Sequence, residues 1–196
     1  MMTHFKTLRG LGTRLGVILL VFISVAATSL AAGDEQPPLE YQVKAACLYW
    51  FPNFVKWPPQ KIGAPDSPFI IGVLGKDPFA GALEAVVEGK KFEQHTLTVR
   101  HISSPAEARA CHLLFISPSE DNRLPAIVKE LRDTPVLTVG ESEKFLARGG
   151  MIKFIIVDNK VRFEINREAA EQAGVHIKSQ LMNLVRLVNN RTDSSR

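Results

Sequence analysis

The apolar positions that follow residue 38 recur with helical spacing. Up to Trp57-Pro58-Pro59 they are Leu39, Val43, Ala46, Cys47, Trp50, Phe54 and Val55. Residues three and four apart share one face of a helix, so this segment is predicted to be an amphipathic helix. Pro52 lacks the N–H that would bond the Leu48 carbonyl, and we expect a kink there.

The same segment carries more aromatic rings than one helix face normally buries. Packing in the core accounts for most of them, and an exposed remainder predicts a binding surface. The candidates for that surface are Tyr49, Trp50, Phe51, Phe54 and Trp57.

Short apolar runs between turn residues predict a series of strands. They cover residues 69–74, 96–102, 112–116, 135–139, 151–157 and 161–165. The run Phe69–Leu74 is apolar throughout, which is typical of a strand buried on both faces, whereas 96–102 alternates. Asp158-Asn159-Lys160 separates the last two strands and predicts a hairpin.

Capping residues predict helices between these strands. Asp77 followed by Pro78 predicts a helix through Val87. Ser104 and Glu107 form a capping box around Pro105, so a short helix is expected towards Ala110. Further helices are predicted at 124–131, at 142–147, after the caps Asn166 and Ser179, the last with Leu181, Leu184, Val185 and Val188 on one face.

Strands that alternate with helices predict the fold class α/β. We expect a single layered domain with a mostly parallel central sheet, an antiparallel C-terminal hairpin and helices on both faces. In such folds ligands bind at the carboxyl ends of the strands. Here those ends lie near Gly75, Ser117 and Gly140.

The N-terminus has the features of an export signal. Lys6, Arg9 and Arg14 precede an apolar run over 15–27, and small residues follow it up to Ala31. This order predicts a signal peptide at 1–31 that is cleaved after Ala31. The alternative is an uncleaved membrane anchor, since no charge occurs between Leu15 and Gly33. We expect a polar lead-in at 32–38, the α/β domain at 39–188 and a flexible tail at 189–196.

Export changes the significance of the net charge. The full chain of 196 residues has 24 Lys and Arg against 20 Asp and Glu, a net charge of +4. Removing the three basic residues of the signal leaves 21 against 20, so the exported chain is close to neutral. A neutral chain without a block of Lys and Arg gives no electrostatic basis for binding nucleic acid.

Most signatures of catalysis are missing from the sequence. It contains no G-x-S-x-G, H-E-x-x-H, Walker A or G-x-G-x-x-G motif. His95 and His101 stand at opposite ends of one predicted strand, too far apart to share a metal ion, and we expect no metal site. The neighbouring carboxylates Glu141 and Glu143 are expected on a solvated helix face. The domain is therefore interpreted as a binding or regulatory protein rather than an enzyme, without cofactors.

Both cysteines, Cys47 and Cys111, lie in the exported part of the chain. An oxidising compartment permits a disulfide between them. The alternative is that both are small buried apolar residues.

Six stretches together resemble the YfiR-like periplasmic proteins. They are Lys44–Pro58 (KAACLYWFPNFVKWP), Ile71–Phe79 (IGVLGKDPF), Cys111–Ser117 (CHLLFIS), Gly149–Ile152 (GGMI), Val161–Asn166 (VRFEIN) and Ser179–Leu181 (SQL). The likeness covers about residues 40–188. It implies a periplasmic α/β domain, usually dimeric, that binds and restrains a membrane-bound signalling protein.

The resemblance also implies the classes of partner that come into question. The namesake restrains an inner-membrane diguanylate cyclase through the periplasmic domain of the cyclase, which lowers cyclic-di-GMP and biofilm formation. Other relatives act with sensor kinases or with uptake systems. Cys111 matches a family cysteine, but Ile71 stands where its partner is expected, so redox control of the namesake's kind is not expected here.

Three basic positions of the YfiR-like pattern predict a possible site for a nucleotide or other small anion. They are Lys56, at the end of the first predicted helix, and His176 and Lys178, in the loop before the last one. The alternative is that these are ordinary solvated charges. A different function is also left open, that of a small-ligand-binding component of an uptake system, which would need an enclosed pocket with convergent polar groups.

Overall fold

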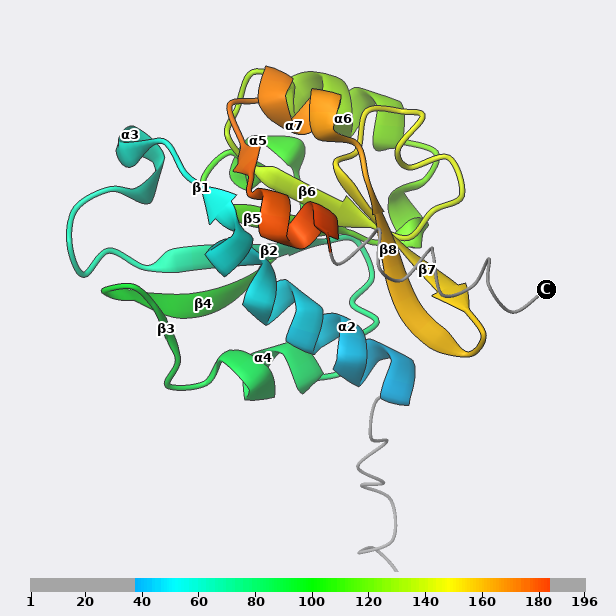
Figure 1. Ribbon diagram of the computed structural model, residues 1–196, viewed down its shortest axis with the longest axis horizontal. Helices are drawn as coiled ribbons and strands as arrows, with labels where there is room; N and C mark the ends of the chain where they lie inside the picture. Colours follow the sequence, from blue (N-terminus) through cyan, green and yellow to red (C-terminus); the bar gives the residue numbers. More distant parts are fainter. Residues whose placement is uncertain (1–37, 184–196) are drawn as a thin grey trace, which may run out of the picture. The chain divides into compact units, whose positions relative to one another are not determined.

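The computed structural model describes residues 38–183, and within them the fold is α/β, as predicted (Figure 1). The central sheet has the strand order β3-β4-β2-β5-β6-β7-β8. Its strands are β2 (Phe69–Leu74), β3 (Lys91–Phe92), β4 (His95–Ile102), β5 (Leu113–Ile116), β6 (Leu137–Gly140), β7 (Ile152–Val157) and β8 (Lys160–Ile165). The five inner strands pair in parallel, and β3 and β8 are antiparallel edge strands.

Helices cover both faces of this sheet (Figure 1). One face carries α2 (Leu39–Trp50) and α4 (Ala82–Val87), which pack against each other. The other face carries α5 (Pro105–Ala108) and α6 (Leu124–Leu131). The short helix α7 (Arg167–Gln172) follows the hairpin, and Asn166 caps it as predicted, its Oδ1 accepting the Ala169 N–H at 3.0 Å.

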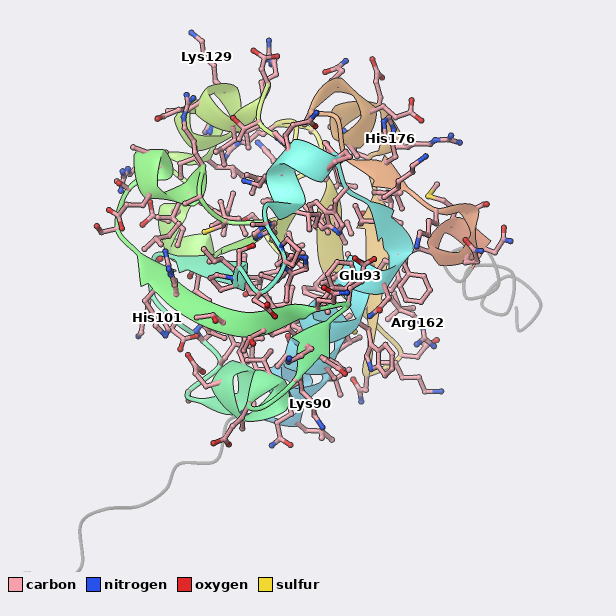
Figure 2. The ribbon with its side chains drawn as sticks, turned by 90° about the vertical axis from the view of Figure 1, so that its left-hand side faces the viewer. Lys90, Glu93, His101, Lys129, Arg162 and His176 are labelled. Atoms are coloured by element: carbon pink, nitrogen blue, oxygen red, sulfur yellow. The ribbon has the colours of Figure 1, made fainter. Side chains whose placement is uncertain are left out.

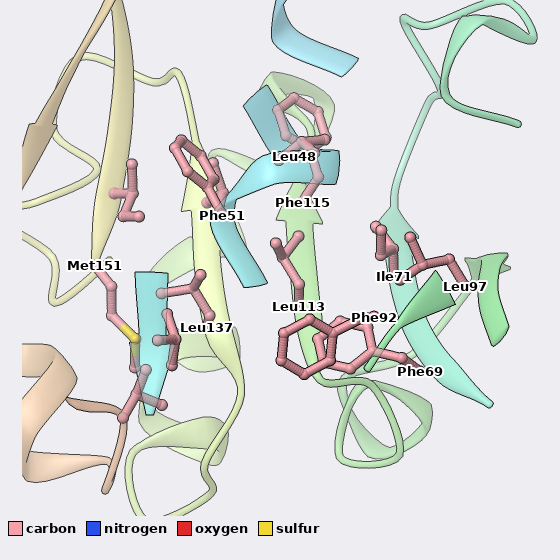
Figure 3. Packing of buried hydrophobic residues seen from close by; sticks show 14 of the residues in the cluster. Leu48, Phe51, Phe69, Ile71, Phe92, Leu97, Leu113, Phe115, Leu137 and Met151 are labelled. Carbon is pink, nitrogen blue, oxygen red and sulfur yellow. The ribbon is translucent and has the colours of Figure 1, made fainter. Parts of the chain in front are cut away.

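Alternation along the buried strands divides the core into two clusters. In β2, Phe69, Ile71 and Val73 point to the α2 face. Ile70 and Leu74 point to the α6 face. The same period of two runs through β5 and β6, as the pleat requires, and Figure 3 shows the cluster beneath α2. A continuous apolar run was therefore the correct sign of a strand with both faces buried.

The hairpin β7–β8 confirms the turn predicted at residues 158–160. Its two central residues, Asp158 and Asn159, have φ of 50° and 55°. Positive φ at both positions is the requirement of a type I′ turn, and Asp and Asn tolerate it better than other non-glycine residues.

The first helix is shorter than predicted. Instead of a kink at Pro52, α2 ends at Trp50 and a 3₁₀ turn, η1 (Phe51–Phe54), follows it. Residues Val55–Lys56 then form a strand, β1, which pairs antiparallel with β9 (His176–Ile177). The proline ends the α-helix because it cannot donate to the carbonyl four residues back.

The helix expected from Asp77 begins five residues later, at Ala82. Asp77 caps a turn instead, since its Oδ1 accepts the Phe79 N–H at 2.8 Å. Ala80 and Gly81 then have φ of 47° and 85°, values that an α-helix does not contain. This turn delivers Phe79 into the core, where it is fully buried.

The helix expected at 142–147 is a succession of turns. Its centre is Phe145, which is fully buried beneath the α6 face. A Cβ on Gly140 or Gly150 would lie 2.4 or 2.2 Å from its ring, so these glycines make room for it. The geometry of this segment is thus set by one aromatic ring rather than by helical periodicity.

Several elements were not predicted. They are the ribbon β1–β9, strand β3, helix α3 (Pro59–Ile62) and the 3₁₀ turn η2 (Pro118–Glu120). The last helix is present at 179–183 and begins with Ser179 itself, so Ser179 does not precede it as a cap. Within residues 38–183, no helix is long and apolar enough to cross a membrane. The predicted signal peptide 1–31, residues 32–37 of the lead-in, Leu184, Val185, Val188 and the tail 189–196 lie outside the described residues.

Candidate functional site

Helix α2 exposes three of its largest apolar side chains. Leu39, Val43 and Trp50 are 74%, 40% and 56% exposed. At a rotation of 100° per residue, these positions fall within about 40° of one another, so they form one stripe along the helix. We call them the α2 stripe.

A groove beside the α2 stripe connects it to the hairpin. Ile156 of β7 is 48% exposed and stands directly opposite Val161 of β8. The residues that line this α2–hairpin groove are Leu39, Glu40, Val43, Ile156, Asn159, Lys160, Val161 and Arg162. The Nε of Arg162 is buried and has no hydrogen-bond partner. The groove therefore combines apolar side chains from both elements with two cations on the hairpin side and the Glu40 carboxylate on the α2 side.

The opposite side of α2 is anchored by a buried lysine. Lys44 is only 3% exposed, and its ammonium forms ion pairs with Glu40 and with Glu141, which follows β6. Tyr41 donates its hydroxyl to Glu141 at 2.9 Å, and its ring centroid lies 4.5 Å from the Lys44 nitrogen. Burial, and then the bond to Glu141, raise the pKa of Tyr41 well above its ordinary value. This cluster fixes the rotation of α2 with its stripe outward.

This cluster was not predicted from the sequence. Glu141 was expected on a solvated helix face, but its side chain is only 10% exposed and pairs with Lys44. Glu141 follows β6 in a segment that contains no helix, and its side chain reaches Lys44 of α2.

The predicted aromatic surface is reduced to one exposed ring. Trp50 is exposed and packs edge-on against the half-buried Tyr49, with ring centroids 5.1 Å apart. Phe51 and Trp57, by contrast, are core residues. Phe51 stacks on Phe154, and Trp57 packs against Phe69. Phe54 is half-buried.

The structure brings together the three basic residues predicted for an anion. Lys56 lies in β1 rather than at a helix end, and it stands directly opposite His176 of β9. Directly paired residues share a face of a ribbon. Lys178 lies two residues beyond His176, and its N–H donates to the Phe54 carbonyl at 2.8 Å, so it continues the same exposed face.

A pocket adjoins these charges. Its lining residues are Val55, Lys56, Trp57, Pro59, Ile62, Gly63, Phe92, Glu93 and Lys178. We call it the ribbon pocket. The indole Nε1 of Trp57 is buried and has no hydrogen-bond partner. Figure 2 shows Glu93 and His176 on this part of the molecule.

The two cysteines are free thiols and lie in different clusters. Cys111 is buried in the cluster beneath α6, whereas the half-buried Cys47 packs against the cluster beneath α2. The sheet separates them, and the disulfide considered as one alternative is not formed. Burial raises the pKa of Cys47, and it raises the pKa of Cys111 to about 11.

Comparison with known protein families identifies a family for this chain. A model of the family described as YfiR/HmsC-like matches residues 41–186, which include every element described above except the first two residues of α2. No curated protein matches the chain.

Proposed function

The chain belongs to the YfiR/HmsC-like family, and on that premise we propose that it binds the periplasmic part of an inner-membrane diguanylate cyclase or sensor kinase and restrains it. The family consists of periplasmic regulators of cyclic-di-GMP signalling, which are not catalytic. They act with membrane signalling proteins. The proposal therefore requires a surface on this protein to which a membrane signalling protein can bind.

The observation that carries the proposal is the α2 stripe. Three large apolar side chains stand in line on a helix whose lysine is buried instead. An arrangement of this kind gives up burial energy in the isolated protein, and contiguous exposed apolar surface is typical of a site for another protein.

The groove also indicates the chemistry of the partner segment. Lys160 and the unpartnered Arg162 Nε lie beside Val43 and Ile156. A segment with apolar side chains for the stripe and one carboxylate for the guanidinium would satisfy both. Restraint then needs no chemistry: a regulator that binds the inactive conformation of the partner more tightly than the active one shifts the population towards inactivity.

The test uses substitutions in the native host. Val43→Asp and Ile156→Asp place a charge in the groove without removing a core side chain. We expect either variant to raise cyclic-di-GMP as far as deletion of the gene does, or to change the output of the kinase as deletion does, at unchanged protein level. The matched control is Lys129→Asp on α6, an exposed position on the other layer.

Two results would contradict the proposal. One is a deletion strain in which cyclic-di-GMP, biofilm and kinase output are all unchanged. The other is a pair of groove variants that are folded, exported and still restrain signalling as well as the wild type.

A second proposal concerns the ribbon pocket, which we propose takes a small anion. The buried Trp57 N–H lacks an acceptor, and Lys56 and Lys178 line the same pocket. The Lys178 ammonium also donates to the Asn53 carbonyl at 2.9 Å, which leaves it further N–H donors. An anion would accept from all three donors. Glu93 also lines the pocket, and its charge disfavours highly charged anions.

Calorimetric titration of the purified protein with inorganic phosphate and with a nucleoside monophosphate tests this site. Lys178→Ala and Lys56→Ala are expected to weaken binding, and Glu93→Gln is expected to strengthen it. An affinity for the anion that is unchanged in all three variants would contradict the proposal. Tight and selective binding of one solute would instead favour the small-ligand component of an uptake system.

A further inference from the structure

Three metal-binding side chains from three elements meet at the carboxyl edge of the sheet. Asp77 lies in the turn after β2, Glu84 in the first turn of α4, and His101 near the end of β4. One ligand atom from each lies within 4.8 Å of the other two. We propose that these residues bind one divalent transition-metal ion, with Zn²⁺ as the expected ion.

The backbone holds the three residues in this arrangement. His101 stands directly opposite Val73 in the parallel pair β2–β4. It therefore lies at the carboxyl end of the strands, next to the turn after β2 that contains Asp77. The Asp77 carboxylate is oriented by its bond with the Phe79 N–H. Carboxyl ends of parallel strands are the usual position of ligand sites in open α/β sheets.

Glu84 supplies the observation that favours a cation at this place. Its Oε1 lies 2.9 Å from His101 Nε2, but its Oε2 is buried with no hydrogen-bond partner. A buried carboxylate oxygen without a donor costs free energy. A cation held between Glu84, His101 and Asp77 would compensate this oxygen, and nothing else around it in residues 38–183 does so.

The donor set indicates the kind of ion. One imidazole and two carboxylates suit Zn²⁺ and its neighbours in the first transition series, whereas Mg²⁺ and Ca²⁺ prefer oxygen ligands alone. The two carboxylates and the ion together are neutral in charge. His101 and Glu84 are 55% and 43% exposed, so the ion has access and water can complete the coordination.

An imidazole nitrogen binds a metal ion through its lone pair. When Nε2 of His101 coordinates the ion, the hydrogen of the ring is therefore on Nδ1. The ligand atoms can approach the ion more closely by side-chain rotation, because the side chains of His101 and Glu84 both reach the surface.

The experiment titrates the exported chain, without an affinity tag, with zinc chloride in a calorimeter. We expect one ion per chain. His101→Ala and Glu84→Gln should each weaken the binding at least about tenfold, and Asp77→Asn should weaken it as well. His176→Ala is the matched control, because it removes another exposed histidine that lies far from His101 in Figure 2.

The outcomes separate this site from ordinary surface binding. If His101→Ala binds zinc like the wild type, or if His176→Ala or Cys47→Ser is the variant that loses the ion, the site is wrong. Equal competition by Mg²⁺ would also overturn it, since that would indicate carboxylates acting without the imidazole. Circular dichroism of each variant checks the fold. This result does not affect the anion and partner proposals, which concern other residues.

Discussion

Helices α2 and α6 lie on opposite faces of one sheet and differ in how many of their large apolar side chains they bury. Helix α6 buries all four of its large apolar side chains, Leu124, Ile127, Val128 and Leu131. Helix α2 buries Ala45 and Leu48 together with Lys44, and it leaves Leu39, Val43 and Trp50 in solvent. The apolar residues of α6 are accounted for by packing, whereas the exposed stripe of α2 is the surface for which a docking role is proposed above.

The largest loss of stability is expected at Lys44, the buried lysine of α2, which has no counterpart on α6. Lys44→Ala leaves Glu141 nearly buried without its cation, and removing one partner of a buried pair typically costs about 3–5 kcal/mol. Denaturant unfolding measures the loss. The control is Lys129→Ala on α6, which removes an exposed lysine and should change stability by less than about 0.5 kcal/mol (Figure 2).

A double variant sharpens this result. Lys44→Met with Glu141→Gln removes both charges and keeps their approximate volumes, so it should recover most of the lost stability. If Lys44→Ala costs no more than Lys129→Ala, the lysine does not anchor α2, and the outward rotation of the stripe needs another cause.

The next effect compares apolar truncations on the two helices. Ile127→Ala removes a fully buried side chain from the α6 cluster and should cost about 2–4 kcal/mol. Val43→Ala truncates an exposed residue of the α2 stripe and should cost less than about 0.5 kcal/mol. Shifts of the denaturation midpoint at unchanged m-value measure both. Equal losses would mean that the stripe belongs to the core.

A third effect lies in the sheet between the two helix layers, at His112. The Ile70 N–H donates to its Nδ1 at 3.0 Å, and its Nε2 lies 2.9 Å from the Lys61 carbonyl, so the neutral ring is fully bonded. Burial, and then the charge of Lys61, lower the pKa of His112 from 6.5 to about 4. Unlike Lys44, this base has no carboxylate partner.

The sign of the pH dependence follows from that lowered pKa. Between pH 6.5 and about 4 the unfolded chain binds a proton that folded His112 does not, so stability falls as the pH falls. We expect a loss of about 2 kcal/mol between pH 7 and pH 5. Unfolding at both pH values measures it, and His112→Gln should be less stable at pH 7 but lose little more at pH 5. A wild type with the same stability at both would refute the assignment.

Much of the fold could be predicted because its signals are local. The apolar run of β2, the amphipathic α6 and the Asp158-Asn159 turn each follow from neighbouring residues. The start of α4 could not be predicted, because a side-chain bond from Asp77 competes with the helix cap. The turns around Phe145 depend on two glycines that only packing explains.

The candidate site was harder to predict, since it depends on contacts between distant residues. An excess of aromatic rings did indicate a surface, but only the rotation of α2 decides that Trp50 is exposed and Phe51 buried. That rotation rests on Lys44 and Glu141, which are 97 positions apart. The same holds for the cluster of Asp77, Glu84 and His101. His95 and His101 stand at opposite ends of β4, as expected from the sequence. One histidine with two carboxylates from other elements leaves no spacing motif.

A small effect on stability should accompany a large effect on binding, at Trp50. Its ring is 56% exposed and its nearest aromatic contact is the edge of Tyr49, so Trp50→Ala should cost about 1 kcal/mol or less in unfolding. An exposed tryptophan at a protein interface often contributes 2 kcal/mol or more, about a thirtyfold change in affinity. Affinity for the periplasmic domain of the partner, measured beside the unfolding curve, tests both parts. Because α6 exposes no large apolar side chain, no truncation on its outer face should separate stability from binding in this way, and a Trp50→Ala variant that keeps full affinity would remove the functional difference between the two helices.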